Sequence, residues 1–76
     1  MKLTAIIKKG EKQFVALCPE LDVVSQGYTI EEAINNLKET CELYLEEMGA
    51  PEEIYSGETI IVNFEIKHEA ASSIKK

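Results

Sequence analysis

Residues 14–33, FVALCPELDVVSQGYTIEEA, predict a strand, a turn and the start of a helix in close succession. The run 13–18 (QFVALC) is apolar on both faces, as in a central strand that is covered on both sides. Pro19 has no amide hydrogen to donate and is expected to end this strand. A short third strand is predicted around residues 23–25. Gly27, which tolerates a positive φ, is expected to turn the chain out of the sheet.

The next residues predict where the helix begins and ends. Thr29 and Glu32 form a T-x-x-E capping box, in which the Thr29 hydroxyl accepts from the Glu32 amide and the Glu32 carboxylate reaches back to the Thr29 amide. An apolar stripe with spacings of three and four follows, comprising Ile30, Ala33, Ile34, Leu37, Cys41, Tyr44, Leu45 and Met48. Gly49 is a C-cap candidate and Pro51 prevents continuation, so the helix is expected to end at residue 48.

Further strands are predicted on both sides of this region. Residues 3–9 (LTAIIKK) are short and β-branched, and residues 58–67 (ETIIVNFEIK) alternate strictly between apolar and largely polar positions. The order β-β-β-α-β predicts an α+β fold with a mixed four-stranded sheet of order 3-2-1-4 and one helix on one face. We expect a single domain over residues 1–67 and a frayed tail over 68–76.

A single helix covers only one face of such a sheet. On the other face Ile6, Val15 or Leu17 would stay exposed, which predicts a partner or a second copy of the chain. The last strand would also be an apolar edge strand. We therefore expect a homodimer or a higher even oligomer.

Charge and cysteine content narrow the classes of function. The 76 residues carry 14 acidic side chains against 8 lysines and no arginine, for a net charge of −6. Direct DNA or RNA binding is disfavoured, and a basic protein partner is favoured. Cys18 and Cys41 are expected to be small buried residues of a reduced protein. The sequence shows neither a signal peptide nor a membrane-spanning segment, so a cytoplasmic location is expected.

A set of residues in and after the opening stretch resembles the N-terminal domain of the HicB antitoxin family, from HicA–HicB toxin–antitoxin systems. They are Phe14, Val15, Pro19, Leu21, Gly27, Thr29, Glu32, Ala33, Leu37 and the downstream ELYLEE. The resemblance implies a truncated ribonuclease-H-like fold and an antitoxin that occludes the active site of a small basic mRNA-cleaving HicA-type toxin. Many family members add a C-terminal DNA-binding domain. Nine residues follow Lys67, so we expect a short form without one.

Catalysis and cofactors are not expected. Two-metal phosphodiester hydrolysis needs several carboxylates around metals about 4 Å apart. The first predicted strand has no carboxylate, and Asp22 is the only aspartate in the chain. His68, the only histidine, lies in the predicted tail, where no other candidate catalytic residue accompanies it. We therefore expect that the protein is not an enzyme and that it holds no metal or cofactor.

One face of the predicted helix is a candidate binding surface. Opposite the apolar stripe lie glutamates that comprise Glu31, Glu32, Glu39, Glu42 and Glu46. Such a cluster is ordinarily a solvated surface, but Leu43 among the glutamates favours a contact with a cationic toxin. The predicted partner-binding residues are Glu39, Glu42, Leu43 and Glu46, and the predicted structural motif is Pro19, Gly27, Thr29 and Glu32.

Two other docking sites and two other functions remain open. The uncovered sheet face or the PELD turn (residues 19–22) could bind the partner instead. The protein could also be an orphan homo-oligomer of the HicB type with a regulatory or structural role. A metal-dependent nuclease is the third possibility.

Overall fold

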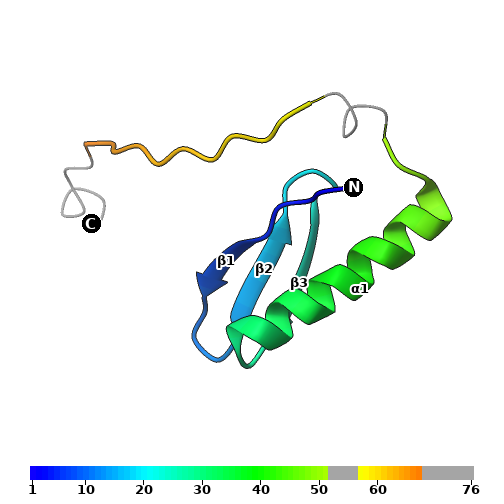
Figure 1. The fold of residues 1–76 in the computed structure, drawn as a ribbon. Helices are drawn as coiled ribbons and strands as arrows, with labels where there is room; N and C mark the ends of the chain where they lie inside the picture. Colours follow the sequence, from blue (N-terminus) through cyan, green and yellow to red (C-terminus); the bar gives the residue numbers. More distant parts are fainter. Residues whose placement is uncertain (52–56, 68–76) are drawn as a thin grey trace, which may run out of the picture.

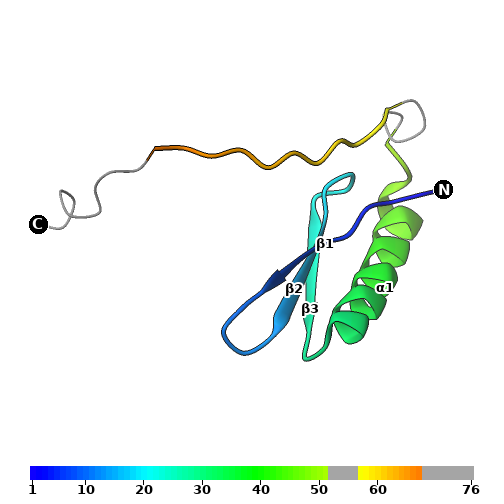
Figure 2. The same cartoon turned by 60° about the vertical axis from the view of Figure 1, so that its left-hand side comes forward.

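The structure, a computed structural model, describes residues 1–51 and 57–67 (Figure 1). Strands β1 (Ile6–Lys9), β2 (Phe14–Cys18) and β3 (Val23–Gly27) form an antiparallel sheet of order β1-β2-β3. Helix α1 (Ile30–Met48) packs over β2 and β3 on one face of this sheet (Figure 2). The α+β class and the predicted bounds of the helix are confirmed.

The register of the strands sorts their side chains onto two faces. Ala16 and Cys18 of β2 are buried toward the helix. Their neighbour Leu17 lies opposite Ile6 of β1 and Val24 of β3, so these three residues form a row on the face away from α1. Pro19 follows β2 directly, as predicted from its missing amide hydrogen.

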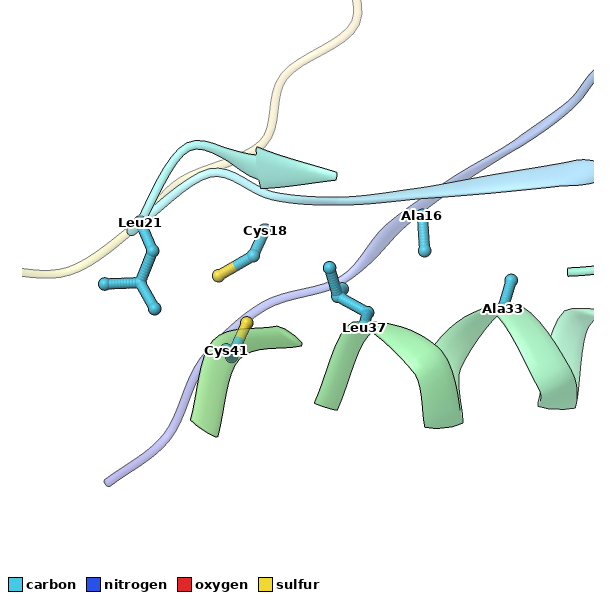
Figure 3. Close-up of a cluster of buried hydrophobic side chains, with 6 residues drawn as sticks. All are labelled: Ala16, Cys18, Leu21, Ala33, Leu37 and Cys41. Carbon is cyan, nitrogen blue, oxygen red and sulfur yellow. The ribbon is translucent and has the colours of Figure 1, made fainter. Parts of the chain in front are cut away.

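The core between the sheet and the helix is small. It consists of Ala16, Cys18, Leu21, Ala33, Leu37 and Cys41 (Figure 3). The helix contributes the three members of the predicted stripe that lie in its centre, whereas Ile30, Ile34 and Met48 remain exposed. Because so few residues are fully buried, the stability of the fold depends on each of them.

The predicted fourth strand is not part of this sheet. Residues 57–67 run as an exposed, extended chain that leads away from β1 in both views (Figures 1 and 2). The four-stranded order 3-2-1-4 is therefore wrong for a single chain. Alternation of apolar and polar residues indicates which side chains share a face of a strand, but it does not specify the strand's partner. The predicted tail, 68–76, lies outside the described residues.

Gly27 is needed for a reason that differs from the predicted one. Its φ is not positive. A Cβ atom at Gly27 would instead lie 2.5 Å from the amide nitrogen of Ala33 and 2.8 Å from the carbonyl carbon of Glu32. Only a residue without a side chain lets the first turn of α1 approach the end of β3 this closely.

The two ends of α1 use the predicted residues, with one change of partner. The Thr29 hydroxyl accepts a hydrogen bond from the Glu32 amide at 3.0 Å, as predicted. The Glu32 carboxylate accepts from the amide of Tyr28, whereas the prediction gave it the amide of Thr29. Gly49, with φ 78°, donates its amide to the carbonyl of Leu45 at 3.0 Å and ends the helix.

Candidate partner-binding surface

The four predicted partner-binding residues lie together on the solvent side of α1. Glu39, Glu42, Leu43 and Glu46 are all exposed. They lie away from the helix face that carries the buried residues Ala33, Leu37 and Cys41. Leu43 is 57% exposed although it is a large apolar side chain. This acidic face, defined as Glu39, Glu42, Leu43 and Glu46, is therefore accessible to a partner.

The helix itself adds to the negative charge of the acidic face. The last turn of α1 contains Glu46 and Glu47 and no basic residue. The C-terminal end of a helix carries a partial negative charge from its free carbonyl groups, so carboxylates there are unfavourable in the isolated protein. Glutamates three and four residues apart also repel one another by a few tenths of a kcal/mol. A cationic partner would relieve both effects.

The sheet face away from α1 offers a second, apolar surface. Its row of Ile6, Leu17 and Val24 crosses all three strands, and Val15 lies on the same face. Val24 is 56% exposed, and the other three are half-buried. This outer face is the one predicted to stay uncovered by the helix. The residues predicted to be exposed on it, Ile6, Val15 and Leu17, are half-buried, and the exposed one is Val24.

The PELD turn is tied to the rest of the fold through Glu20. Its carboxylate accepts from the amide of Thr4 at 2.9 Å and from the hydroxyl of Thr4 at 2.6 Å. The Cys18 thiol donates to it at 3.5 Å. Glu20 thus joins the turn after β2 to the segment before β1. This contact was not predictable from the sequence, because the two residues lie 16 positions apart and share no local pattern.

The environment of Glu20 stabilises its charged form. Partial burial by itself would raise the pKa of this carboxyl, but hydrogen bonds from Thr4 and the side chain of Thr59 outweigh it. The pKa of Glu20 is therefore lowered to about 2. Thr59 belongs to the extended segment 57–67, so the start of this segment lies near Glu20.

An apolar hollow lies between α1 and the residues that precede β1. Its volume is about 440 Å³, and Leu3, Ala5, Ile34 and Leu45 are among the residues that line it. Thr4, Lys38 and Glu42 contribute its polar lining, and through Glu42 the hollow adjoins the acidic face. Ile34 was predicted as a core residue, and it is exposed because nothing in the described part of the chain fills this space.

The two cysteines are core residues. Cys18 of β2 and Cys41 of α1 are buried with their sulfur atoms pointing toward one another (Figure 3). Burial raises the pKa of the Cys41 thiol to about 11, and the neighbouring Cys18 adds to the effect. A thiol with such a pKa stays protonated and is a poor nucleophile.

The described residues contain no group of three or more histidine, cysteine, aspartate or glutamate side chains that could hold a metal ion. His68 lies outside the described residues. None of the helices in the described part of the chain is both long enough and apolar enough to cross a membrane.

Comparison with known proteins identifies a relative. A UPF0150 protein of Helicobacter pylori (strain J99 / ATCC 700824) is 45% identical to this chain over 53 residues. The matched region covers 68% of this chain and 74% of the relative. No family model and no solved structure matches the chain.

Proposed function

This chain belongs to the UPF0150 family, and from that membership we propose that it is an antitoxin of the HicB type. In this proposal it binds a small basic mRNA-cleaving toxin of the HicA type and occludes the toxin's active site. The UPF0150 family is itself HicB-like, which supports this assignment. The protein carries out no chemistry of its own and works in the cytoplasm, where its target would cleave messenger RNA.

The observation that carries the proposal is the acidic face of α1. An enzyme that cleaves RNA needs a cationic surface for the phosphate backbone of its substrate. A protein surface rich in glutamates is complementary to that surface and competes with RNA for it. Charge complementarity of this kind raises the association rate and selects the partner.

Leu43 gives the acidic face a point of contact that is not electrostatic. A large apolar side chain within a charged surface becomes buried when a partner covers it. The surrounding Glu39, Glu42 and Glu46 would then form the polar rim that is typical of protein interfaces. Glutamates therefore guide the encounter, and Leu43 slows dissociation.

The proposal includes the truncated ribonuclease-H-like architecture of the HicB family, with which the observed fold is consistent. The order β-β-β-α and the packing of α1 on one sheet face support it. Two of the carboxylates of this chain, Glu20 and Asp22, lie in the turn after β2. Glu20 is engaged by Thr4, and Asp22 lies exposed in the turn after β2 with φ 59°. Neither arrangement gathers carboxylates around a metal pair, which supports an inhibitor over a nuclease.

Co-expression in bacteria tests the proposal in cells. A HicA-type toxin encoded beside this chain is induced alone, with this protein, or with a variant in which Glu39, Glu42 and Glu46 are all replaced by lysine. The parent protein should restore growth, and the variant should restore it less at equal abundance. Growth arrest that persists with abundant parent protein would contradict the antitoxin function.

A second candidate function is that of an orphan homo-oligomer with a regulatory or structural role. The observation that favours it is the outer apolar face of Ile6, Leu17 and Val24, which a second copy could cover. The two candidates differ in a direct binding measurement. An orphan oligomer would self-associate but would show no affinity for a HicA-type toxin.

A further inference from the structure

The extended segment 57–67 exposes an unusual amount of apolar surface. Its five large apolar side chains, Ile60, Ile61, Val62, Phe64 and Ile66, are between 55% and 83% exposed. Four of these alternate along the chain and therefore share one face of an extended strand. A segment with this pattern and exposure has the properties of a strand without its sheet.

The sheet has a matching vacant edge at β1. This strand pairs with β2 along one side only, so the amide and carbonyl groups of its other side have no strand partner among the described residues. Helix α1 covers β2 and β3 and leaves this edge accessible. A further strand can add here through ordinary backbone hydrogen bonds.

The apolar hollow lies next to the same edge and on the helix side of the sheet. Leu3 and Ala5, which line it, directly precede β1, and Ile34 and Leu45 line it from α1. A strand added beside β1 would direct every second side chain into this hollow. The strand that fits must therefore alternate between apolar and polar residues, as residues 58–67 do.

One chain thus carries both an unpaired strand, segment 57–67, and a vacant sheet edge at β1, but the two do not pair with each other. Segment 57–67 begins beside Lys2, Thr4 and Glu20 and then leads away from its own β1 (Figures 1 and 2). Two copies of the chain can each supply a strand to the other, which closes the assembly with two-fold symmetry.

The charges of β1 and of segment 57–67 also favour binding of a second copy of the chain. Strand β1 carries Lys8 and Lys9, and the extended segment carries two carboxylates, Glu58 and Glu65, against one lysine, Lys67. Elsewhere the net charge of −6 makes two copies repel one another. The basic edge of β1 therefore favours contact with the acidic segment of another copy.

We propose that residues 58–67 form a strand exchanged between two copies of the protein. Each segment lies along β1 of the second copy, with Ile60, Val62 and Phe64 directed into its apolar hollow. Ile61 and Asn63 then face outward, where Ile61 extends the row formed by Ile6, Leu17 and Val24. This inference is independent of toxin binding, because both halves of the interface belong to the chain itself.

The mass in solution is the first test, using light scattering after gel filtration at micromolar concentration. The parent should have twice the 8.5 kDa mass of one chain. A Val62→Asp/Phe64→Asp variant should be a monomer, and the matched Asn63→Asp variant should remain a dimer. Circular dichroism checks that the helix persists in each. A monomeric parent, or a dimer that survives the double substitution, would overturn the proposal.

Disulfide trapping is the second test and distinguishes exchange from folding back onto the same chain. A Lys8→Cys chain is mixed with Ile61→Cys, Asn63→Cys or Glu65→Cys chains, since these positions lie on the outward faces of the two strands. Mild oxidation should give a covalent heterodimer with at least one of them. Asn35→Cys, on the exposed surface of α1, should give none, and neither should the parent with its buried Cys18 and Cys41.

A chain that carries both Lys8→Cys and the best partner substitution completes the test. Strand exchange predicts covalent dimers on a non-reducing gel. A covalent link confined to single chains would show that the segment folds onto its own β1 and would overturn the proposal. Equal trapping by Asn35→Cys would show random collision and would overturn it as well.

Discussion

The carboxylate of Glu20 receives both the amide and the hydroxyl of Thr4, at 2.9 Å and 2.6 Å. Two hydrogen bonds from one residue to the two oxygens of one carboxylate fix the segment before β1 against the turn after β2. Through Thr59 the same carboxylate also meets the start of the extended segment. A single glutamate thus connects three parts of the chain that are distant in sequence.

This contact predicts a pH-dependent contribution to stability. The pKa of Glu20 is lowered from 4.5 to about 2 in the folded protein, so its contribution is complete above pH 4.5 and disappears as the pH falls to 2. Glu20→Gln should be less stable than the parent at pH 7, and the difference should shrink from pH 4.5 to pH 2.5. Urea midpoints at several pH values measure it. A difference that is constant with pH would show that the charge of Glu20 is irrelevant.

Removal of the helix cap should destabilise the fold. Thr29→Ala leaves the Glu32 amide without its hydroxyl partner and should cost about 1 kcal/mol. Thr40→Ala is a matched control, because the Thr40 hydroxyl only bonds to the carbonyl of Asn36 within the helix and its loss should change stability by less than about 0.5 kcal/mol. Urea denaturation of both variants provides the comparison. Equal midpoints would place the start of the helix elsewhere.

A side chain at Gly27 should be poorly tolerated. Even Gly27→Ala places a Cβ atom within 3 Å of the backbone of Glu32 and Ala33, and relief of the clash should cost about 1–3 kcal/mol. Gly49→Asn is a suitable control, because Gly49 has open space around it and asparagine tolerates a positive φ. Thermal unfolding should show a loss for Gly27→Ala and a small change for Gly49→Asn. The reverse ranking would contradict the close approach of α1 to β3.

Charge reversal on the acidic face should change the kinetics of toxin binding. The triple variant Glu39→Lys/Glu42→Lys/Glu46→Lys should associate with a HicA-type toxin at least tenfold more slowly at low salt. Its association rate should also lose most of the salt dependence of the parent, because screening weakens an attraction that the variant lacks. Surface plasmon resonance at two ionic strengths measures both effects.

Leu43→Ala is the matched variant on the same face, since it alters contact area without altering charge. Its association rate should stay near that of the parent, and its dissociation should be faster. If both rates match the parent in the two variants while the parent still binds, the toxin docks elsewhere, on the outer sheet face or the PELD turn.

Features that depend on neighbouring residues were predictable from the sequence. The helix over Ile30–Met48 follows from its apolar period, its Thr29 cap and Gly49. Strand β2 follows from an apolar run that ends at Pro19. The acidic face was predictable for the same reason, because the spacing of residues along a helix determines which of them share a side.

Features that depend on distant residues were not predictable. The contact between Glu20 and Thr4 joins residues with no common sequence pattern. The need for glycine at position 27 was predicted, but the reason was not. Its role depends on how near α1 comes to β3 and not on its own backbone angle. For residues 58–67 the apolar face was visible, whereas the pairing partner was not, since any open edge can accept an alternating strand.

Titration of a HicA-type toxin's ribonuclease activity with the purified protein tests the antitoxin function most directly. The toxin encoded beside this chain is held at a fixed concentration, and cleavage of a labelled messenger RNA is followed as the protein is added. Antitoxin function predicts a linear loss of cleavage that is complete at a fixed stoichiometric ratio, without any cleavage by this protein alone. Undiminished cleavage in the presence of excess protein would contradict it.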